Sequence, residues 1–276
     1  MFDISVINLK RAVFRRGLSM GFLVGSGFPL EDIYIHEARD GADYKDTVLL
    51  CEAAVRAGYP LFERSLVDKS YTSLHVGVAA LTWSWHEICK RVIERDIPTV
   101  VLHDDVRPLY GYRDFVNLVD GLNSYDKDWK FVNLSLHTQR GSFDMFREDM
   151  AKYRVYGTGM IQVVFGMYSQ LEDSVLVSPA GARWLLEEMY PSSFINMDDE
   201  LFDVDAWMGC SGKEIWSTPE IFFMYLTCFV DFSRSVGGVY TVWAACFDKF
   251  KRDYVGSYIY DVDAYFERDE WVFLSY

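Results

Sequence analysis

Hydrophobic and polar positions along the chain follow two different periods. Three short runs are rich in apolar and β-branched residues and have the length of strands, at residues 3–9 (DISVINL), 32–38 (DIYIHEA) and 99–102 (TVVL). The basic run KRAVFRR after the first strand can open a helix. Before the third strand, apolar residues recur at steps of three and four and predict an amphipathic helix from Gly77 to about Arg95: Val78, Leu81, Trp85, Ile88 and Val92. Strands that alternate with helices predict an α/β fold, with helices flanking a mixed, mostly parallel central sheet.

The second half of the chain continues this pattern less regularly. Residues 130–136 (KFVNLSL) and 174–178 (SVLVS) are expected to form strands, and residues 179–190 begin with proline and carry a leucine-rich helical face. The last fifty residues give no clear assignment. Since no low-complexity linker or internal repeat separates the parts, we expect one main domain at 1–225 and a C-terminal elaboration at 226–276 that packs on it.

Composition narrows the class of partner. A formal net charge of -14 repels phosphate backbones and anionic lipid, so extended nucleic acid is not the expected partner. A small polyanion held through a divalent cation stays compatible with this charge. The five cysteines are odd in number and widely spaced, and no segment approaches the roughly 20 apolar residues that span a bilayer. We expect a soluble cytoplasmic protein without a membrane span.

An acidic pair follows the strand at 99–102. His103, Asp104 and Asp105 stand at its carboxyl end, where ligands bind in open α/β sheets. Carboxylates at this position can hold Mg²⁺ or Mn²⁺ together with the oxygens of a bound phosphate. The alternative interpretation is that the pair caps a helix or faces solvent in a turn.

Several motifs in order resemble glycosyltransferase family 25, which includes bacterial lipooligosaccharide galactosyltransferases and collagen galactosyltransferases. They span roughly residues 3–225 and are INLKRAVFRR, EARDGAD, GVAALTWSWHEICKRVI, VVLHDDV, SVLVSPAGARWLL and FDVDAWM followed by IWSTPEIFF. The resemblance implies a GT-A type fold for nucleotide-diphospho-sugar transfer. In the helix motif, Gly77 and Ser84 match the family, whereas Val78, Ala80, Leu81 and Trp85 replace its Glu, Gly, Cys and His.

The resemblance also assigns roles to the acidic pair. It implies that Asp105 contacts a Mn²⁺ or Mg²⁺ ion and that Asp104 contacts the sugar-nucleotide. His103 stands where the family has its first acid, and an imidazole can ligate manganese although it is a softer ligand than a carboxylate. This departure implies either weaker metal binding or coordination mainly through Asp105.

Five further residues are candidates for donor binding. Arg15 matches the arginine downstream of the family's first strand, where a guanidinium reaches a uracil edge or a diphosphate, and its alternative is a solvated basic helix face. Asn8 can orient the nucleotide or cap the next helix. Asp40 and Gly41 lie where the family approaches the base and ribose, although a plain Asp-Gly turn explains them equally. Ser84 is assigned to the donor by its match alone.

The stretch NMDDELFDVDAW is dense in carboxylates. Crowded like charges raise carboxylate pKa values, which suits a general base that takes the proton of an acceptor hydroxyl. The resemblance favours Asp205 for this role and Asp199 second, and the alternative is a solvated acidic loop.

These expectations describe a metal-assisted, inverting hexosyltransferase that moves galactose or glucose from a UDP-sugar to a hydroxyl of a glycan acceptor. A protein side chain or a modified DNA base is the alternative acceptor, and a non-catalytic nucleotide-sugar binding module is the alternative class. The sequence leaves the donor sugar, the acceptor and the oligomeric state open. Neither a P-loop nor a dinucleotide-binding glycine motif follows a strand.

Overall fold

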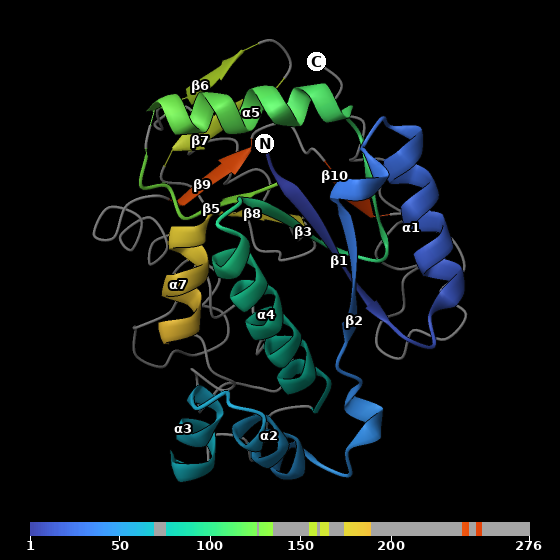
Figure 1. Ribbon diagram of the computed structural model, residues 1–276, viewed down its shortest axis with the longest axis vertical. Helices are drawn as coiled ribbons and strands as arrows, with labels where there is room; N and C mark the ends of the chain where they lie inside the picture. Colours follow the sequence, from blue (N-terminus) through green and yellow to red (C-terminus); the bar gives the residue numbers. More distant parts are fainter. Residues whose placement is uncertain are drawn as a thin grey trace, which may run out of the picture.

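A computed structural model of the 276-residue chain describes residues 1–68, 76–125, 127–134, 155–158, 161–165, 174–188, 239–242 and 247–249. Its centre is a mixed eight-stranded sheet (Figure 1) in the order β2-β1-β3-β8-β5-β9-β7-β6. Strands β7 and β8 run against the other six. The bounds are β1 Asp3–Leu9, β2 Ile33–Ala38, β3 Thr99–His103, β5 Phe131–Asn133, β6 Val155–Thr158, β7 Ile161–Phe165, β8 Ser174–Val177 and β9 Val239–Val242. A separate antiparallel pair joins β4 (Val106–Pro108) to β10 (Phe247–Lys249).

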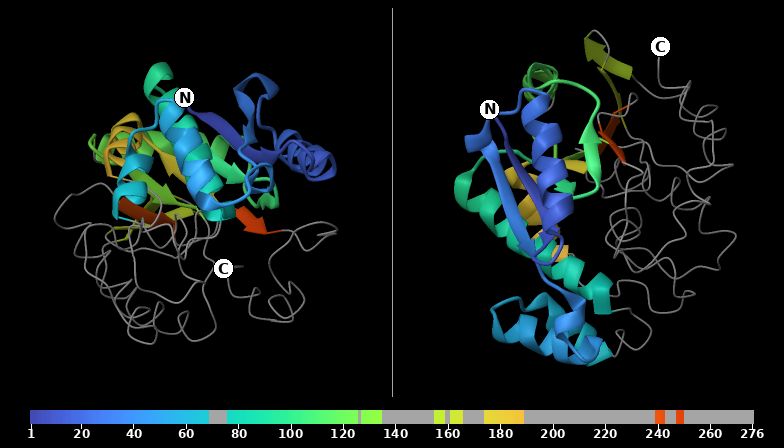
Figure 2. Two further views of the ribbon diagram at one scale, coloured as in Figure 1. Left: turned by 90° about the horizontal axis from the view of Figure 1, so that it is seen from below. Right: turned by 90° about the vertical axis from the view of Figure 1, so that its right-hand side faces the viewer.

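Helices cover both faces of the sheet. They are α1 Val13–Gly25, α2 Thr47–Arg56, α3 Leu61–Asp68, α4 Val76–Arg95, α5 Tyr112–Tyr125 and α7 Pro179–Glu188, with short 3-10 turns η1 at Leu30–Asp32 and η2 at Gly41–Asp43. In Figure 1, α4 crosses the sheet beside α7, and α1 lies at the outer edge. The right-hand view of Figure 2 shows α2 and α3 together at one end of the molecule, next to the start of α4.

Two hydrophobic cores result from the alternation of side chains along the strands. Ile4 and Val6 of β1 pack with α1 and α5 on one face, whereas Ile7 packs with α2, α3, α4 and α7 on the other. In β3, Val101 likewise points to the opposite face from its two neighbours. The parallel strands β1 and β3 are therefore buried on both sides, which is why their sequences read as continuous apolar runs.

The core between the sheet and helices α2, α3, α4 and α7 contains two cysteines. Cys51 of α2 and Cys89 of α4 are free thiols and fully buried. Burial raises the pKa of Cys51 to about 12, and it also raises the pKa of Cys89. Both side chains therefore act as small hydrophobic groups rather than as nucleophiles.

The regular elements expected from the sequence are confirmed. Strands form at β1, β2, β3 and β8, and a short strand β5 forms inside 130–136. Helix α1 begins within the basic run at 10–16, and α4 and α7 begin within one residue of the expected positions. The mixed, mostly parallel sheet with flanking helices is also as expected. Strand β9 falls in the segment that we expected to elaborate the domain, and it pairs between β5 and β7 inside the central sheet.

Helices α2, α3 and α5 were not expected. Helix α5 buries Phe115, Leu118, Val119 and Leu122 against the core that it shares with α1. Within the described residues, no helix combines the length and the apolar character that a membrane crossing requires.

Candidate functional site

The carboxyl ends of β1, β2 and β3 meet at one edge of the sheet. In the parallel register Asn8 is level with Glu37 of β2, and Ile7 is level with His103 of β3. The chain then leaves β1 toward the face covered by α1 and leaves β2 toward the face covered by α4. Open α/β sheets bind ligands at the edge where the connections that leave neighbouring strands go to opposite faces of the sheet.

Three of the predicted donor residues meet at this edge. The side-chain amide of Asn8 donates to Asp104 Oδ2 at 2.6 Å and to the carbonyl oxygen of Ala12 at 3.1 Å. The guanidinium of Arg15, in the first turn of α1, lies 3.3 Å from Asp104 Oδ1. Both oxygens of the Asp104 carboxylate therefore have partners within the chain.

Burial dominates the electrostatics of Asp104. Its exposed fraction is only 5%, and this desolvation raises the pKa of the carboxyl from 3.8 to about 6. Arg15 and the hydrogen bond from Asn8 lower the pKa, whereas the neighbouring Asp105 raises it. The buried Asp104 carboxylate is stabilised by the guanidinium of Arg15, and this ion pair in turn fixes the position of the Arg15 side chain.

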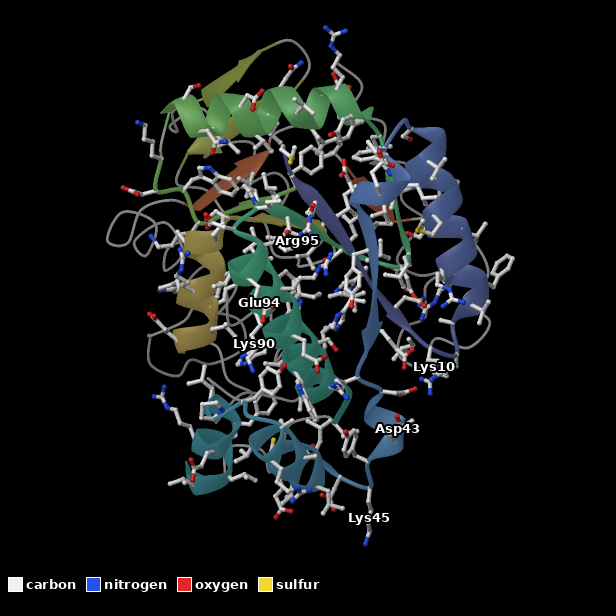
Figure 3. The ribbon with its side chains drawn as sticks, in the orientation of Figure 1. Lys10, Asp43, Lys45, Lys90, Glu94 and Arg95 are labelled. Atoms are coloured by element: carbon white, nitrogen blue, oxygen red, sulfur yellow. The ribbon has the colours of Figure 1, made fainter. Side chains whose placement is uncertain are left out.

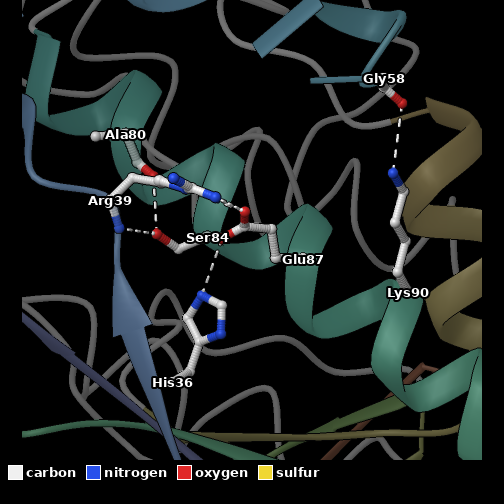
Figure 4. A network of polar contacts seen from close by, with 7 residues as sticks. All are labelled: His36, Arg39, Gly58, Ala80, Ser84, Glu87 and Lys90. Atoms are coloured by element: carbon white, nitrogen blue, oxygen red, sulfur yellow. Dashed lines mark hydrogen bonds and ion pairs between the residues drawn. The ribbon is translucent and has the colours of Figure 1, made fainter. Parts of the chain in front are cut away.

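A second polar cluster joins β2 to α4 (Figure 4). Glu87 of α4 accepts from Arg39 through Nε at 3.0 Å and through Nη2, and its other oxygen lies 3.3 Å from His36 Nε2. Burial alone raises the pKa of Glu87, but the hydrogen bonds from His36 and Arg39 outweigh it and leave the pKa lowered. The guanidinium of Arg39 also lies 4.5 Å from the centre of the Trp83 ring.

Ser84 belongs to this second cluster. Its hydroxyl accepts from the backbone N–H of Arg39 at 2.9 Å and donates to the carbonyl oxygen of Ala80 at 3.0 Å. The side chain is fully buried. In this structure Ser84 fastens the end of β2 to α4, and its assignment to the donor stays a prediction.

Asp40 and Gly41 form the turn after β2. The Asp40 carboxylate accepts from the backbone N–H of Ala42 at 2.9 Å, as in an Asx turn, and its other oxygen lies 2.7 Å from Arg11 Nη1. A Cβ added at Gly41 would lie 3.0 Å from Gly77 Cα, so the absence of a side chain permits close contact with the start of α4. The Asp-Gly turn expected from the sequence is thus present, and the Arg11–Asp40 ion pair connects it to the segment that follows β1.

Ion pairs bridge the segments that follow β1 and β2. The Arg11–Asp40 pair is joined by a wider one between Lys10 and Glu37 at 3.5 Å, which is largely exposed. Figure 3 shows Lys10 beyond the end of β1 and Arg95 toward the opposite end, where Arg95 pairs with Asp3 at the start of the strand. The arginines of the candidate site are therefore matched by carboxylates, and an anionic ligand has to compete with them.

The residues expected to hold a metal ion lie beside this cluster. His103 is the last residue of β3 and is partly buried, and Asp105 lies two residues after it and is buried. Within the described residues, no group of three or more His, Cys, Asp or Glu side chains is arranged to hold a cation. Asp104 fits poorly as a cation ligand, because the positive guanidinium of Arg15 lies beside one of its oxygens and Asn8 donates to the other. His103 and Asp105 fit only as a partial donor set, which a bound diphosphate must complete.

The proposed general bases, Asp205 and Asp199, lie outside the described residues. Glu87 was missed by the sequence analysis, although it stands one helical turn after Ser84 on the same face of α4. No protein-family model matches the chain, and a search of curated proteins also finds no match.

Proposed function

We propose that the protein is a GT-A type glycosyltransferase that transfers a hexose from a UDP-sugar to a hydroxyl group of a glycan acceptor. The observation that supports this proposal best is the meeting of Asn8, Arg15 and Asp104 at the carboxyl edge of the sheet. These residues come from three separate segments, and the resemblance to glycosyltransferase family 25 assigns all three to the donor.

Arg15 is the residue proposed to bind the donor diphosphate. A guanidinium offers several N–H donors, and Arg15 uses Nη1 toward Asp104. Asp104 then acts as a positioning residue, because its buried carboxylate contacts both Asn8 and Arg15. Asp40, Gly41 and Ser84 would shape the neighbouring part of the donor site through the turn after β2.

Asp105 and His103 would hold a Mn²⁺ or Mg²⁺ ion with the donor diphosphate. Such an ion supplies charge neutralisation for the departing nucleotide. Asp205, with Asp199 second, is the proposed base for the acceptor hydroxyl, and inversion at the sugar is inferred from the family. A cytoplasmic location belongs to the same proposal, because Cys51 and Cys89 are free thiols.

A thermal-shift series with UDP-glucose, UDP-galactose and GDP-mannose, each with and without Mn²⁺, tests the donor. A UDP-sugar present at about 100 times its Kd is expected to raise Tm by roughly 5 °C or more. Arg15→Ala should weaken the binding of that donor at least about tenfold, because it removes a charge-assisted contact to phosphate. Arg56→Ala, an exposed arginine on α2, serves as the matched control.

Two results would overturn parts of this proposal. If no nucleotide sugar shifts Tm and none is hydrolysed, the transferase assignment fails. If a donor binds but is never hydrolysed or transferred with Mn²⁺ present, the non-catalytic binding module becomes the better assignment. The binding module is considered because His103 replaces the first acid of the family's metal motif.

A further inference from the structure

Helix α1 turns an apolar side outward. Val13 is 58% exposed, Phe14 62% and Val24 50%. At 100° per residue these three side chains fall on one side of the helix together with the exposed Gly17, Gly21 and Gly25. A helix on the surface of a globular protein normally places charged and polar residues there.

Two polar side chains of α1, Arg15 and Ser19, point away from this side. Arg15 reaches back to Asp104, and Ser19 is fully buried against the sheet. Helix α1 therefore exposes apolar residues on its outer side, although its Leu23 packs in the core. We define the outer face of α1 as Val13, Phe14, Gly17, Gly21, Val24 and Gly25, and no charged residue interrupts it.

The three glycines of this face have no role within the described chain. A Cβ added at Gly17, Gly21 or Gly25 would meet no atom within 4 Å, and none of the three has a positive φ. Each glycine inside a helix costs about 1 kcal/mol relative to alanine. Their spacing of four residues leaves a shallow strip along which another helix can approach closely.

We propose that a second copy of this chain packs against the outer face of α1, with the two α1 helices antiparallel about a twofold axis. The face is complementary to itself in that arrangement. With the axis midway between Gly17 and Gly21, Gly17 of one copy lies opposite Gly21 of the other, and Phe14 lies opposite Val24. Such a twofold contact uses the same patch on both copies.

The charges at the two ends of α1 fit the antiparallel arrangement. Lys10 precedes the helix and its side chain is 81% exposed, whereas the exposed Glu31 follows the helix in η1. An antiparallel partner brings the basic end of one copy toward the acidic end of the other. Leu30, which is 63% exposed, extends the apolar contact at the same end.

A membrane surface fits this face less well. A helix that lies in a lipid interface gains its binding energy from large apolar side chains flanked by free basic residues. Here the middle of the face is glycine, so the face offers few large apolar side chains to lipid. This inference is independent of the proposed function, because it uses the outer side of α1 and not the side that carries Arg15 to Asp104.

Sedimentation velocity of the full-length protein tests the proposal. The wild type is expected to change from the 32.0 kDa chain to a species of twice that mass, with a Kd of roughly 10 µM. Gly21→Lys and Phe14→Glu should each weaken the dimer at least about 30-fold, since each places a charge inside an apolar contact. Val67→Glu is the matched control, because Val67 is 77% exposed but lies on α3.

Unfolding is not expected to confuse the result for Gly21→Lys, because lysine favours a helix more than glycine does. A circular dichroism melt of each variant checks this. In addition, the double variant Gly17→Cys/Gly21→Cys should form a disulfide between two chains under mild oxidation, and Val67→Cys should not.

The proposal is wrong if the wild type stays monomeric at roughly ten times that Kd. It is also wrong if Val67→Glu dissociates the dimer as strongly as Gly21→Lys does. Sedimentation with anionic vesicles separates the remaining case: a monomer that binds vesicles, and loses that binding in Phe14→Glu, would assign the outer face to lipid.

Discussion

Arg15 and Asp104 hold two distant parts of the chain together: the guanidinium from the first turn of α1 lies 3.3 Å from the carboxylate that follows β3. The Asp104 side chain is 7% exposed and that of Arg15 is 21% exposed. Because a buried carboxylate without a cation is costly, each residue depends on the other. The Arg15–Asp104 pair therefore contributes to the stability of the fold and, in the proposed function, to binding of the donor.

A double-mutant cycle should measure this dependence. Arg15→Ala is expected to lower the free energy of unfolding by about 1–3 kcal/mol, because it strands a buried charge. In an Asp104→Asn background the same substitution should cost about 1–2 kcal/mol less, since no charge is stranded there. Urea unfolding at pH 7 gives both values, and purely additive effects would show that the pair is not coupled.

The unfolding free energy should depend on pH in an unusual direction at Asp104. Its pKa rises from 3.8 in the unfolded chain to about 6 in the fold, so the folded protein binds the proton more tightly. The stability that Asp104 contributes is complete below pH 4 and is lost as pH rises through 6. The free energy of unfolding of Asp104→Asn, relative to that of the wild type, should therefore increase by on the order of 2 kcal/mol from pH 4 to pH 7.

Urea unfolding in EDTA across this pH range provides the measurement. Asp120→Asn, an exposed position on α5, is the control and should follow the wild-type curve. A difference between Asp104→Asn and the wild type that stays constant with pH would contradict the expected titration.

Glu87 should show the opposite pH dependence. Its lowered pKa means that its contribution to stability is present above the unfolded value of 4.5 and is lost as pH falls through the folded value. Glu87→Gln is expected to cost about 1–2 kcal/mol at pH 7, because His36 and Arg39 lose a charged acceptor, and less at acid pH. Glu52→Gln, in an exposed pair with Arg56, should change stability by less than about 0.5 kcal/mol.

Ser84→Ala separates a role in the fold from a role at the donor. The hydroxyl holds the backbone N–H of Arg39, so its loss should lower the free energy of unfolding by about 1–2 kcal/mol. If Ser84 only supports β2, the Kd for the donor should change less than twofold in a titration below the melting range. A large rise in that Kd would instead support the assignment made from the family resemblance.

Gly181 should tolerate no side chain. A Cβ at this position of α7 would lie 2.1 Å from the carbonyl oxygen of Lys130, and that atom belongs to the backbone. Gly181→Ala is therefore expected to destabilise the protein by about 2–4 kcal/mol, as measured by urea unfolding. Ala180→Ser, at the exposed neighbouring position, is the control and should stay within about 0.5 kcal/mol of the wild type.

The elements that sequence predicted well are those with one dominant pattern. β1 and β3 are buried on both faces and read as unbroken apolar runs, and α4 carries a clear stripe. Helix α5 was missed because Asp120 and Gly121 favour a turn, although the apolar stripe through Phe115 and Leu122 outweighs them. The place of β8 between β3 and β5 leaves no mark in the sequence, because it is decided by tertiary packing.

The candidate site shows a similar division. Its position after β3 could be predicted, because apolar strands that end on polar residues mark the functional edge of such sheets. The pairing of Asp104 with Arg15 could not, since it depends on how α1 crosses the sheet. The burial of Ser84 did have a signal: it stands between Ala80 and Ile88 at steps of four, on a face that is otherwise apolar.

The buried thiols of Cys51 on α2 and Cys89 on α4 can be used to measure local unfolding of these two helices. With the pKa of Cys51 near 12, almost no thiolate exists at neutral pH, and neither sulfur is accessible to a reagent in the folded state. Alkylation of Cys51 and Cys89 therefore has to wait for α2 and α4 to separate. The rate at which these two positions acquire a mass label, read by peptide mass spectrometry, measures how often that separation occurs.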